Sequence, residues 1–322
     1  TIKTETSQMN KKIFIATFSF SLLLQTGTLT AQTIAQKVNA LLKKMTLEEK
    51  VGQMTQISLD ALVKTKNGKT LEPHIIDTAR LIECISKYKV GSILNVGGEA
   101  QTQKVWQERI ALIQQIALKD RMKIPVLYGI DAIHGNNYTA NSVMFPQQIA
   151  QAASFNPGLV QKGAEASAYV TRASFIPWTF SPVLDLGRQP VWPRLWETFG
   201  EDPYLDTQLG LSMVKGFQGS SAHIDNYIDK YHVAACLKHY MGYSMQLSGH
   251  DRTPAWIPER ELREYFLPPF AAAVKHGAKT VMVNSAEING LPVHANKHIL
   301  TDILKGELQF KGFVVSDWQD IR

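Results

Sequence analysis

The feature that most constrains the fold of this chain is a repeated alternation of short apolar runs with longer segments of helical periodicity. A strand, a helix and a further strand in succession normally build a parallel sheet, because the helix carries the chain back to the start of the next strand. No GxGxxG turn of the dinucleotide-binding kind interrupts the series, which favours a β/α barrel over an open doubly wound sheet. The expected strands lie at residues 54–59, 90–95, 125–130, 178–183, 232–238, 280–284 and 312–316.

Helices are expected before and between these strands. Asp202 followed by Pro203 is typical of a helix start, with the aspartate as N-cap and the proline in the first turn. Seven strands are one fewer than the eight βα units of a complete barrel. We therefore expect residues 32–322 to form a (β/α)8 barrel-like domain that is incomplete at its C-terminus. The expected helices lie at residues 33–44, 46–53, 73–87, 101–119, 157–171, 203–217, 259–276 and 296–308.

Residues 1–31 have the pattern of a secretory signal that follows a short upstream segment. Lys11 and Lys12 form a positively charged start, residues 13–24 are apolar, and small and polar residues lead to Ala31. The apolar stretch is too short for a comfortable membrane span, and no cysteine near its end suggests a lipid anchor. We expect an exported protein, periplasmic or extracellular, without a membrane anchor.

Composition narrows the classes of partner. The 322 residues include 34 Lys and Arg against 28 Asp and Glu, a net charge of +6, with no basic run, so nucleic acid is not an expected partner. The two cysteines, Cys84 and Cys236, do not indicate a disulfide framework, and Cys236 lies in an apolar run where a buried thiol is expected. The histidines lack metal-ligand spacing, so we predict neither a metal nor another cofactor. The sequence leaves the oligomeric state open.

Polar residues follow five consecutive expected strands. The carboxyl ends of the strands of a β/α barrel meet at one rim, where the loops build the active site. Polar residues at the ends of several strands therefore predict one polar pocket. The residues in question are Asp131, Arg194, Lys238 with His239, Ser285, and Asp317 with Trp318.

Taken singly, several of these residues have simpler interpretations. Asp317 could cap a following helix, Asp131 could stabilise a turn, and His239 could be an ordinary buried histidine. Arg194 lies among apolar residues, where a guanidinium normally needs a carboxylate or a ligand as partner. Lys238 ends an apolar strand and does not fit a solvated surface charge.

Two reactions fit a pocket of this composition. In the first, Asp317 attacks the anomeric carbon of a sugar, and charged groups around it bind the sugar hydroxyls. Neighbouring Arg and Lys are then expected to lower the pKa of Asp317 and keep it ionised. In the second, Lys238 forms a Schiff base, as in an aldolase. Such a lysine needs a lowered pKa, and the carboxylates expected nearby argue against it.

Several longer motifs decide between the two. LYGIDAIHG, WETFGEDP, KHYMGYS, SGHDRTPAWIPERELREYFLPPF and GFVVSDW occur in this order, and from residue 33 onward the chain resembles the family-three glycoside hydrolases, in particular the exo-acting β-glucosidases. The resemblance implies a barrel-like catalytic domain. It makes Asp317 the catalytic nucleophile and Trp318 part of an aromatic clamp on the next sugar. It assigns binding of the terminal sugar to Asp131, Arg194, Lys238 and His239.

The resemblance also sets limits on what this chain is expected to do. The family's acid/base glutamate normally lies on a second α/β sandwich domain, which we do not find in the sequence. The loop with Ser285 is small and polar, unlike that of relatives with an aromatic ring there, and KHYMGYS lacks the KHFPGHG-like pattern of the single-domain N-acetylglucosaminidases. We expect residues 32–322 alone to hydrolyse natural glucosides poorly.

The expected substrates of the whole protein are small glucosides and oligosaccharides. Asp131 is shorter than a glutamate and should leave room for the hydroxymethyl arm of glucose, so we predict cleavage of terminal β-glucosyl residues with retention of configuration. The alternatives are a β-xylosidase or β-N-acetylglucosaminidase of the same family, and a carbohydrate-binding barrel without catalysis.

Overall fold

The structure is a computed structural model that describes residues 33–67, 69–71, 74–219 and 227–321. The chain divides into two units, Thr1–Thr46 and Leu47–Arg322. The described part of the first unit contains helix α2 (Ile34–Lys44), in which Thr33 and Gln36 form a capping box. The secretory signal predicted at residues 1–31 lies outside the described residues. None of the helices in the described ranges is both long and apolar enough to cross a membrane.

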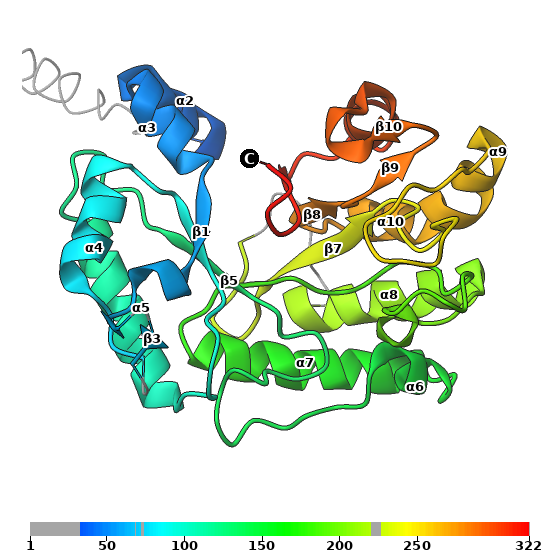
Figure 1. Ribbon diagram of the computed structural model, residues 1–322, viewed down its shortest axis with the longest axis horizontal. Helices are drawn as coiled ribbons and strands as arrows, with labels where there is room; N and C mark the ends of the chain where they lie inside the picture. Colours follow the sequence, from blue (N-terminus) through cyan, green and yellow to red (C-terminus); the bar gives the residue numbers. More distant parts are fainter. Residues whose placement is uncertain (1–32, 68, 72–73, 220–226, 322) are drawn as a thin grey trace, which may run out of the picture. The chain divides into compact units, whose positions relative to one another are not determined.

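The second unit is built on a curled parallel sheet (Figure 1). Its strands pair in chain order, each parallel to the one before it, which confirms the predicted β/α architecture. All seven expected strands are present within the described ranges. They are β1 (Gln56–Ser58), β4 (Ser92–Leu94), β5 (Leu127–Ile130), β6 (Trp178–Thr179), β7 (Ala234–Tyr240), β8 (Thr280–Val283) and β11 (Phe313–Val315).

Helices follow the outer side of this sheet, as Figure 1 shows for α4, α5, α7, α8 and α10. The start predicted for one of them is confirmed, since the Asp202 carboxylate accepts a hydrogen bond from the Leu205 N–H and Pro203 stands in the first turn. The helices are α3 (Leu47–Gln53), α4 (Thr78–Ile82), α5 (Gln103–Ala117), α6 (Gln148–Ala152), α7 (Pro157–Ala173), α8 (Pro203–Gln218), α9 (Glu259–Glu261) and α10 (Leu267–Lys275). Shorter or more irregular helical segments are η1 (Leu59–Leu62), η2 (Glu83–Lys87), η3 (Leu195–Glu197), η4 (Leu262–Phe266), η5 (Val293–Ala295) and η6 (His298–Glu307).

Two small hairpins, which the sequence did not predict, lie outside the main sheet. Strand β2 (Thr65–Lys66) pairs with β3 (Lys69–Thr70), and β9 (Glu287–Ile288) pairs with β10 (Leu291–Pro292). The second hairpin belongs to the long connection between β8 and η6, so it extends the loops at the carboxyl end of the sheet.

Aromatic and apolar side chains form a separate core cluster among the strands. Its buried members are Trp178, Phe180, Cys236 and Met282. Gly129 in β5 is required by this packing, because a Cβ atom there would lie 2.4 Å from Cζ of Phe180. Strand β5 therefore packs closely against the rings of Phe180 and Trp178. This packing fixes the position of Asp131, two residues after Gly129.

Candidate active site

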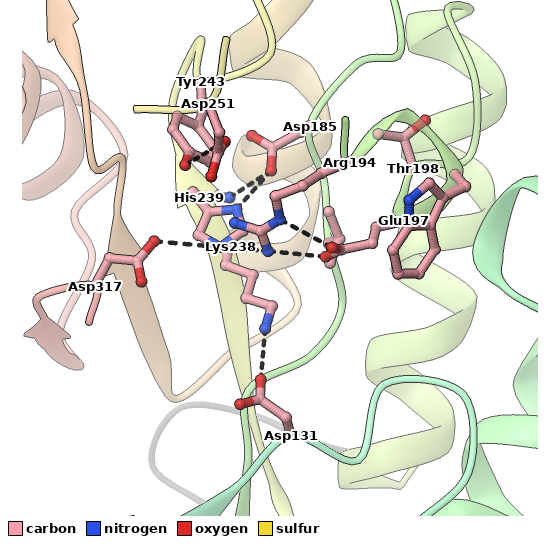
Figure 2. Close-up of polar contacts among 12 residues, drawn as sticks. Asp131, Asp185, Arg194, Glu197, Thr198, Lys238, His239, Tyr243, Asp251 and Asp317 are labelled. Carbon is pink, nitrogen blue, oxygen red and sulfur yellow. Dashed lines mark hydrogen bonds and ion pairs between the residues drawn. The ribbon is translucent and has the colours of Figure 1, made fainter. Parts of the chain in front are cut away.

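The predicted polar residues come together because the strands are parallel. Asp131 directly follows β5, Lys238 and His239 lie near the end of β7, and Asp317 lies two residues beyond β11. All four therefore lie toward the carboxyl edge of the sheet, and Figure 2 shows their side chains around one centre. The rule that carboxyl strand ends meet at one rim thus describes this site correctly.

Lys238 and Asp131 form a close ion pair. The lysine Nζ lies 2.7 Å from Asp131 Oδ1, and the lysine side chain is only 4% exposed. The amide of Asn95, the residue after β4, donates to Asp131 Oδ2 at 2.7 Å and accepts from the Asp131 N–H at 3.0 Å. Asp131 is 30% exposed, so it is fixed by protein contacts and still open to a ligand.

His239 is held by a buried carboxyl group that the sequence analysis missed. Asp185, in the segment after β6, accepts a hydrogen bond from the His239 backbone N–H at 3.1 Å, and the same Oδ2 atom lies 2.7 Å from His239 Nδ1. Burial raises the pKa of Asp185 to about 8, and burial together with the Arg194 charge lowers the pKa of His239 well below its ordinary value. His239 is therefore neutral at pH 7, and its Nε2 faces the centre of the site.

Glu197, a second residue that the sequence analysis missed, orients the Arg194 guanidinium. The guanidinium donates from Nε and Nη2 to the two Glu197 oxygens at 2.9 and 2.8 Å. This bidentate pair supplies the carboxylate partner that the apolar surroundings of Arg194 led us to expect. Nη2 also lies 3.3 Å from His239 Nε2, so the pair and the imidazole belong to one network (Figure 2).

Asp317 faces this network from the other side. Its Oδ2 lies 3.6 Å from His239 Nε2, and its side chain is 10% exposed. Burial raises the pKa of Asp317 above the usual aspartate value, and the Trp318 N–H and the charges of Arg252, Arg194 and Lys238 only partly offset that rise. The expectation that neighbouring cations give Asp317 a net lowered pKa is therefore wrong, because loss of solvation outweighs them.

The aromatic ring of Tyr243 packs against both Arg194 and His239. The Tyr243 ring lies 5.0 Å from the His239 ring and below the Arg194 guanidinium. The Tyr243 hydroxyl and the Trp192 N–H both donate to Asp251 Oδ1, at 2.7 and 2.9 Å. These hydrogen bonds fix the orientation of both rings.

The remaining two predicted residues lie in the loops at the same edge of the sheet. The Ser285 hydroxyl donates to Asp320 Oδ2 at 2.6 Å, so in this structure it holds a neighbouring loop. Trp318 is half exposed, and its backbone oxygen accepts a hydrogen bond from Arg252 at 2.7 Å. Its ring is thus available at the edge of the site.

The residues that the sequence analysis missed differ in how clearly the sequence indicates them. Asp185 is a polar residue shortly after a strand, so the strand-end rule applied to β6 would have found it. Glu197 lies three residues after Arg194, a spacing that brings side chains together in a helical turn. Arg252 lies in a long loop with no such regularity, and only the fold brings it to Asp317.

No group of three or more His, Cys, Asp or Glu side chains in the described ranges is arranged to hold a metal ion. Cys84 and Cys236 are both free thiols and both buried.

Comparison with known proteins identifies the family. The model of the "Glycosyl hydrolase family 3 N terminal domain" matches residues 46–322. The chain belongs to glycosyl hydrolase family 3. It is 44% identical over 294 residues to a lysosomal beta glucosidase of Dictyostelium discoideum, covering 88% of this chain and 35% of that protein. It is 37% identical over 227 residues to a beta-xylosidase of Formosa agariphila, covering 68% of this chain and 31% of that protein.

The fold comparison agrees with this family membership. An exo-1,3/1,4-beta-glucanase from a Pseudoalteromonas species matches with a TM-score of 0.78 and 30% sequence identity, over 91% of this chain and 36% of that chain. The family 3 chain described here thus spans about a third of the length of each of these relatives.

Proposed function

We propose that this chain forms the nucleophile-bearing part of a retaining exo-β-glucosidase, with Asp317 as the nucleophile. The observation that carries the proposal is the environment of Asp317 Oδ2. This oxygen is buried and accepts no hydrogen bond from the described residues, yet it faces the network of Arg194, Lys238 and His239. A carboxylate oxygen left without a donor in a polar site is suited to bond formation with a substrate carbon.

The proposed reaction proceeds in two steps. Asp317 Oδ2 attacks the anomeric carbon and forms an ester bond, while the bond to the leaving oxygen breaks and its electron pair goes to that oxygen. A general acid protonates the leaving oxygen. Water then attacks the anomeric carbon, gives a proton to the same group and releases the Asp317 carboxylate, with net retention of configuration.

The surrounding charges are suited to binding the hydroxyls of one sugar ring. Asp131 can accept hydrogen bonds, Arg194 and Lys238 can donate them, and neutral His239 presents Nε2 as an acceptor. The Arg194 guanidinium, which can only donate, lies 3.3 Å from His239 Nε2, so it favours the tautomer that carries its proton on Nδ1 and a lone pair on Nε2. We assign binding of the terminal glucosyl unit to these four residues, and contact with the next sugar to the Trp318 ring.

We propose that the acid/base glutamate lies outside residues 1–322. Retaining glycosidases need a second carboxyl about 5 Å from the nucleophile. The nearby carboxyls are already engaged, since Asp185 holds His239, Glu197 holds Arg194, and Asp251 and Asp320 accept two or more hydrogen bonds each. The greater length of the relatives leaves room for a further domain that supplies it.

The test compares turnover of nitrophenyl β-glucoside and nitrophenyl β-xyloside by the protein expressed from its whole reading frame. A clear preference for the glucoside, lost in Asp317→Asn, supports the proposal. The similarity to a beta-xylosidase makes the xyloside the informative competitor. A preference for the xyloside would overturn the assignment of substrate while leaving the nucleophile in place.

Two rival functions give different results in the same preparations. A carbohydrate-binding barrel without catalysis binds glucose equally well before and after Asp317→Asn and turns over neither substrate. An aldolase is trapped on Lys238 by borohydride in the presence of a carbonyl substrate. The 2.7 Å contact between Lys238 and Asp131 disfavours that reaction, because the amine is already held by Asp131 and is not free to attack a carbonyl carbon.

We also propose that the protein is exported, on the basis of the signal-like pattern at residues 1–31. N-terminal sequencing of the protein purified from its native host tests this. A mature start near residue 32 supports export, and an N-terminus that still contains residues 13–24 contradicts it.

A further inference from the structure

The two carboxylate oxygens of Asp317 lie in different environments. Oδ1 accepts hydrogen bonds from the Trp318 N–H and from Arg252 Nη2, the latter at 3.2 Å. Oδ2 forms no hydrogen bond with any described residue, and it lies 3.6 Å from His239 Nε2. The protein therefore holds one oxygen and leaves the other directed into the site.

Arg252 does more than contact one atom. It comes from the loop between β7 and α9, and its Nη1 donates to the Trp318 backbone oxygen at 2.7 Å and to Asp320 Oδ1 at 3.1 Å. One guanidinium thus ties together three residues of the loop that follows β11. A planar fork with fixed donor directions can impose such a geometry, whereas a lysine ammonium cannot.

Asp320 holds the Arg252 guanidinium in place and is itself held by a contact with a third loop. Its Oδ2 accepts the Ser285 hydroxyl at 2.6 Å, and His294 Nε2 lies 3.7 Å away. Asp320 is 12% exposed at its side chain, so the pair with Arg252 is partly shielded from water and salt. The loops after β7, β8 and β11 therefore meet in one hydrogen-bonded unit behind Asp317.

Building on the proposed function, we propose that Arg252 is a positioning residue that selects Oδ2 of Asp317 as the attacking atom. Arg252 holds Oδ1, so the carboxylate cannot rotate and Oδ2 points to where the anomeric carbon binds. In the first chemical step the new bond forms between that carbon and Oδ2. The bond to the leaving oxygen breaks with its electron pair, and the general acid protonates that oxygen. In the transition state Arg252 balances the part of the carboxylate charge still on Oδ1, and the completed ester is neutral.

The experiment measures covalent labelling by 2,4-dinitrophenyl 2-deoxy-2-fluoro-β-glucoside, whose leaving group needs little protonation. The protein is expressed from its whole reading frame, and the labelling rate at saturation and the Kd for glucose are measured separately. Arg252→Gln is expected to lower the saturated labelling rate by about a hundredfold, the scale of a misplaced reacting group. The Kd for glucose, followed by tryptophan fluorescence, is expected to stay unchanged.

Two further variants and a control sharpen the result. Arg252→Lys keeps the charge but not the fork and should recover only part of the rate. Asp320→Asn changes neither Arg252 nor Asp317. It weakens the contact that holds the Arg252 guanidinium, so it should also slow labelling. Arg263→Gln is the control, because Arg263 likewise joins two segments through Glu259 and Glu307 but takes no part in the network around Asp317, and it should label like the wild type.

Each remaining outcome overturns a specific statement. Arg252→Gln labelled at the wild-type rate overturns the positioning role. A weakened Kd with an unchanged saturated rate makes Arg252 a sugar contact and also overturns it. If Arg252→Gln fails to bind glucose because it does not fold, Asp320→Asn labelled at the wild-type rate overturns it instead. A wild-type protein that is never labelled overturns the proposed function itself, and the inference with it.

Discussion

Lys238 Nζ lies 2.7 Å from Asp131 Oδ1, although the two residues are 107 positions apart in the chain. Strands β5 and β7 bring them together, with β6 between them in the sheet. Because Lys238 is almost fully buried, its positive charge is balanced mainly by Asp131. The pair is therefore a rigid feature of the site, and it exists before any sugar binds.

This pair gives a first prediction. Asp131→Asn removes the charge but keeps the size, so the buried Lys238 loses its counter-ion and the site loses a strong acceptor. We expect kcat/KM for a glucoside to fall by about thirtyfold or more, since losing one partner of a buried charge pair costs about 2–5 kcal/mol. Asp120→Asn is the control, because Asp120 pairs with Lys89 at 2.8 Å elsewhere in the fold. Equal kcat/KM values for the two variants would contradict the assignment of Asp131.

The bidentate pair of Arg194 and Glu197 gives a second prediction. Glu197→Gln removes one acceptor oxygen and the charge that directs the guanidinium, so Arg194 should no longer hold its geometry. We expect kcat/KM to fall by roughly tenfold or more, as for one charge-assisted contact. Glu264→Gln, which breaks an exposed pair with Arg260, is the matched control and should leave the kinetics unchanged. A Glu197→Gln enzyme with normal KM and kcat shows that Arg194 does not need this partner.

A third prediction concerns stability and pH. Asp206 in α8 is fully buried, and neither carboxyl oxygen forms a hydrogen bond with the described residues. Burial, with a smaller contribution from Asp185, raises its pKa well above the ordinary value. The native state therefore keeps a proton that the unfolded chain loses above about pH 3.9, so the free energy of unfolding falls as pH rises, by at most about 1.4 kcal/mol per pH unit.

Asp206→Asn removes this titration. We expect urea unfolding to show a variant more stable than the wild type at pH 7.5, with the difference shrinking toward pH 4.5. Asp202→Asn is the control, since Asp202 caps the same helix from an exposed position and asparagine caps equally well. A difference between Asp206→Asn and wild type that does not change with pH would show that Asp206 is ionised in the native state.

The sequence predicted the framework well because the framework depends on local patterns. Each of the seven strands is a short apolar run, and the parallel order places Asp131, Lys238, His239 and Asp317 at one edge without further information. The environment of each group was harder to predict. The pKa of Asp317 is raised rather than lowered because burial, which depends on how the loops fold over it, outweighs the nearby cations.

The positions of Arg252 and Asp320 could not have been predicted from the same patterns. They come from loops after β7 and β11 that have no strand or helix periodicity, and their contact depends on how these loops cross. Ser285 shows the same limit, since its place after β8 was predicted but its bond to Asp320 was not. Side chains at strand ends or just beyond them could be placed from sequence, and loop-to-loop contacts could not.

The central claim is that Asp317 forms the covalent bond to the sugar, and one measurement tests it most directly. The protein expressed from its whole reading frame is incubated with a 2-fluoro-β-glucoside, digested with trypsin and analysed by mass spectrometry. Cleavage after Lys311 and Arg322 yields a peptide of residues 312–322 that contains Asp317 and Asp320, and fragmentation separates the two. We predict the sugar label on Asp317 and none on Asp317→Asn. A label on Asp320, Glu287 or any other residue of the wild-type protein would contradict the account.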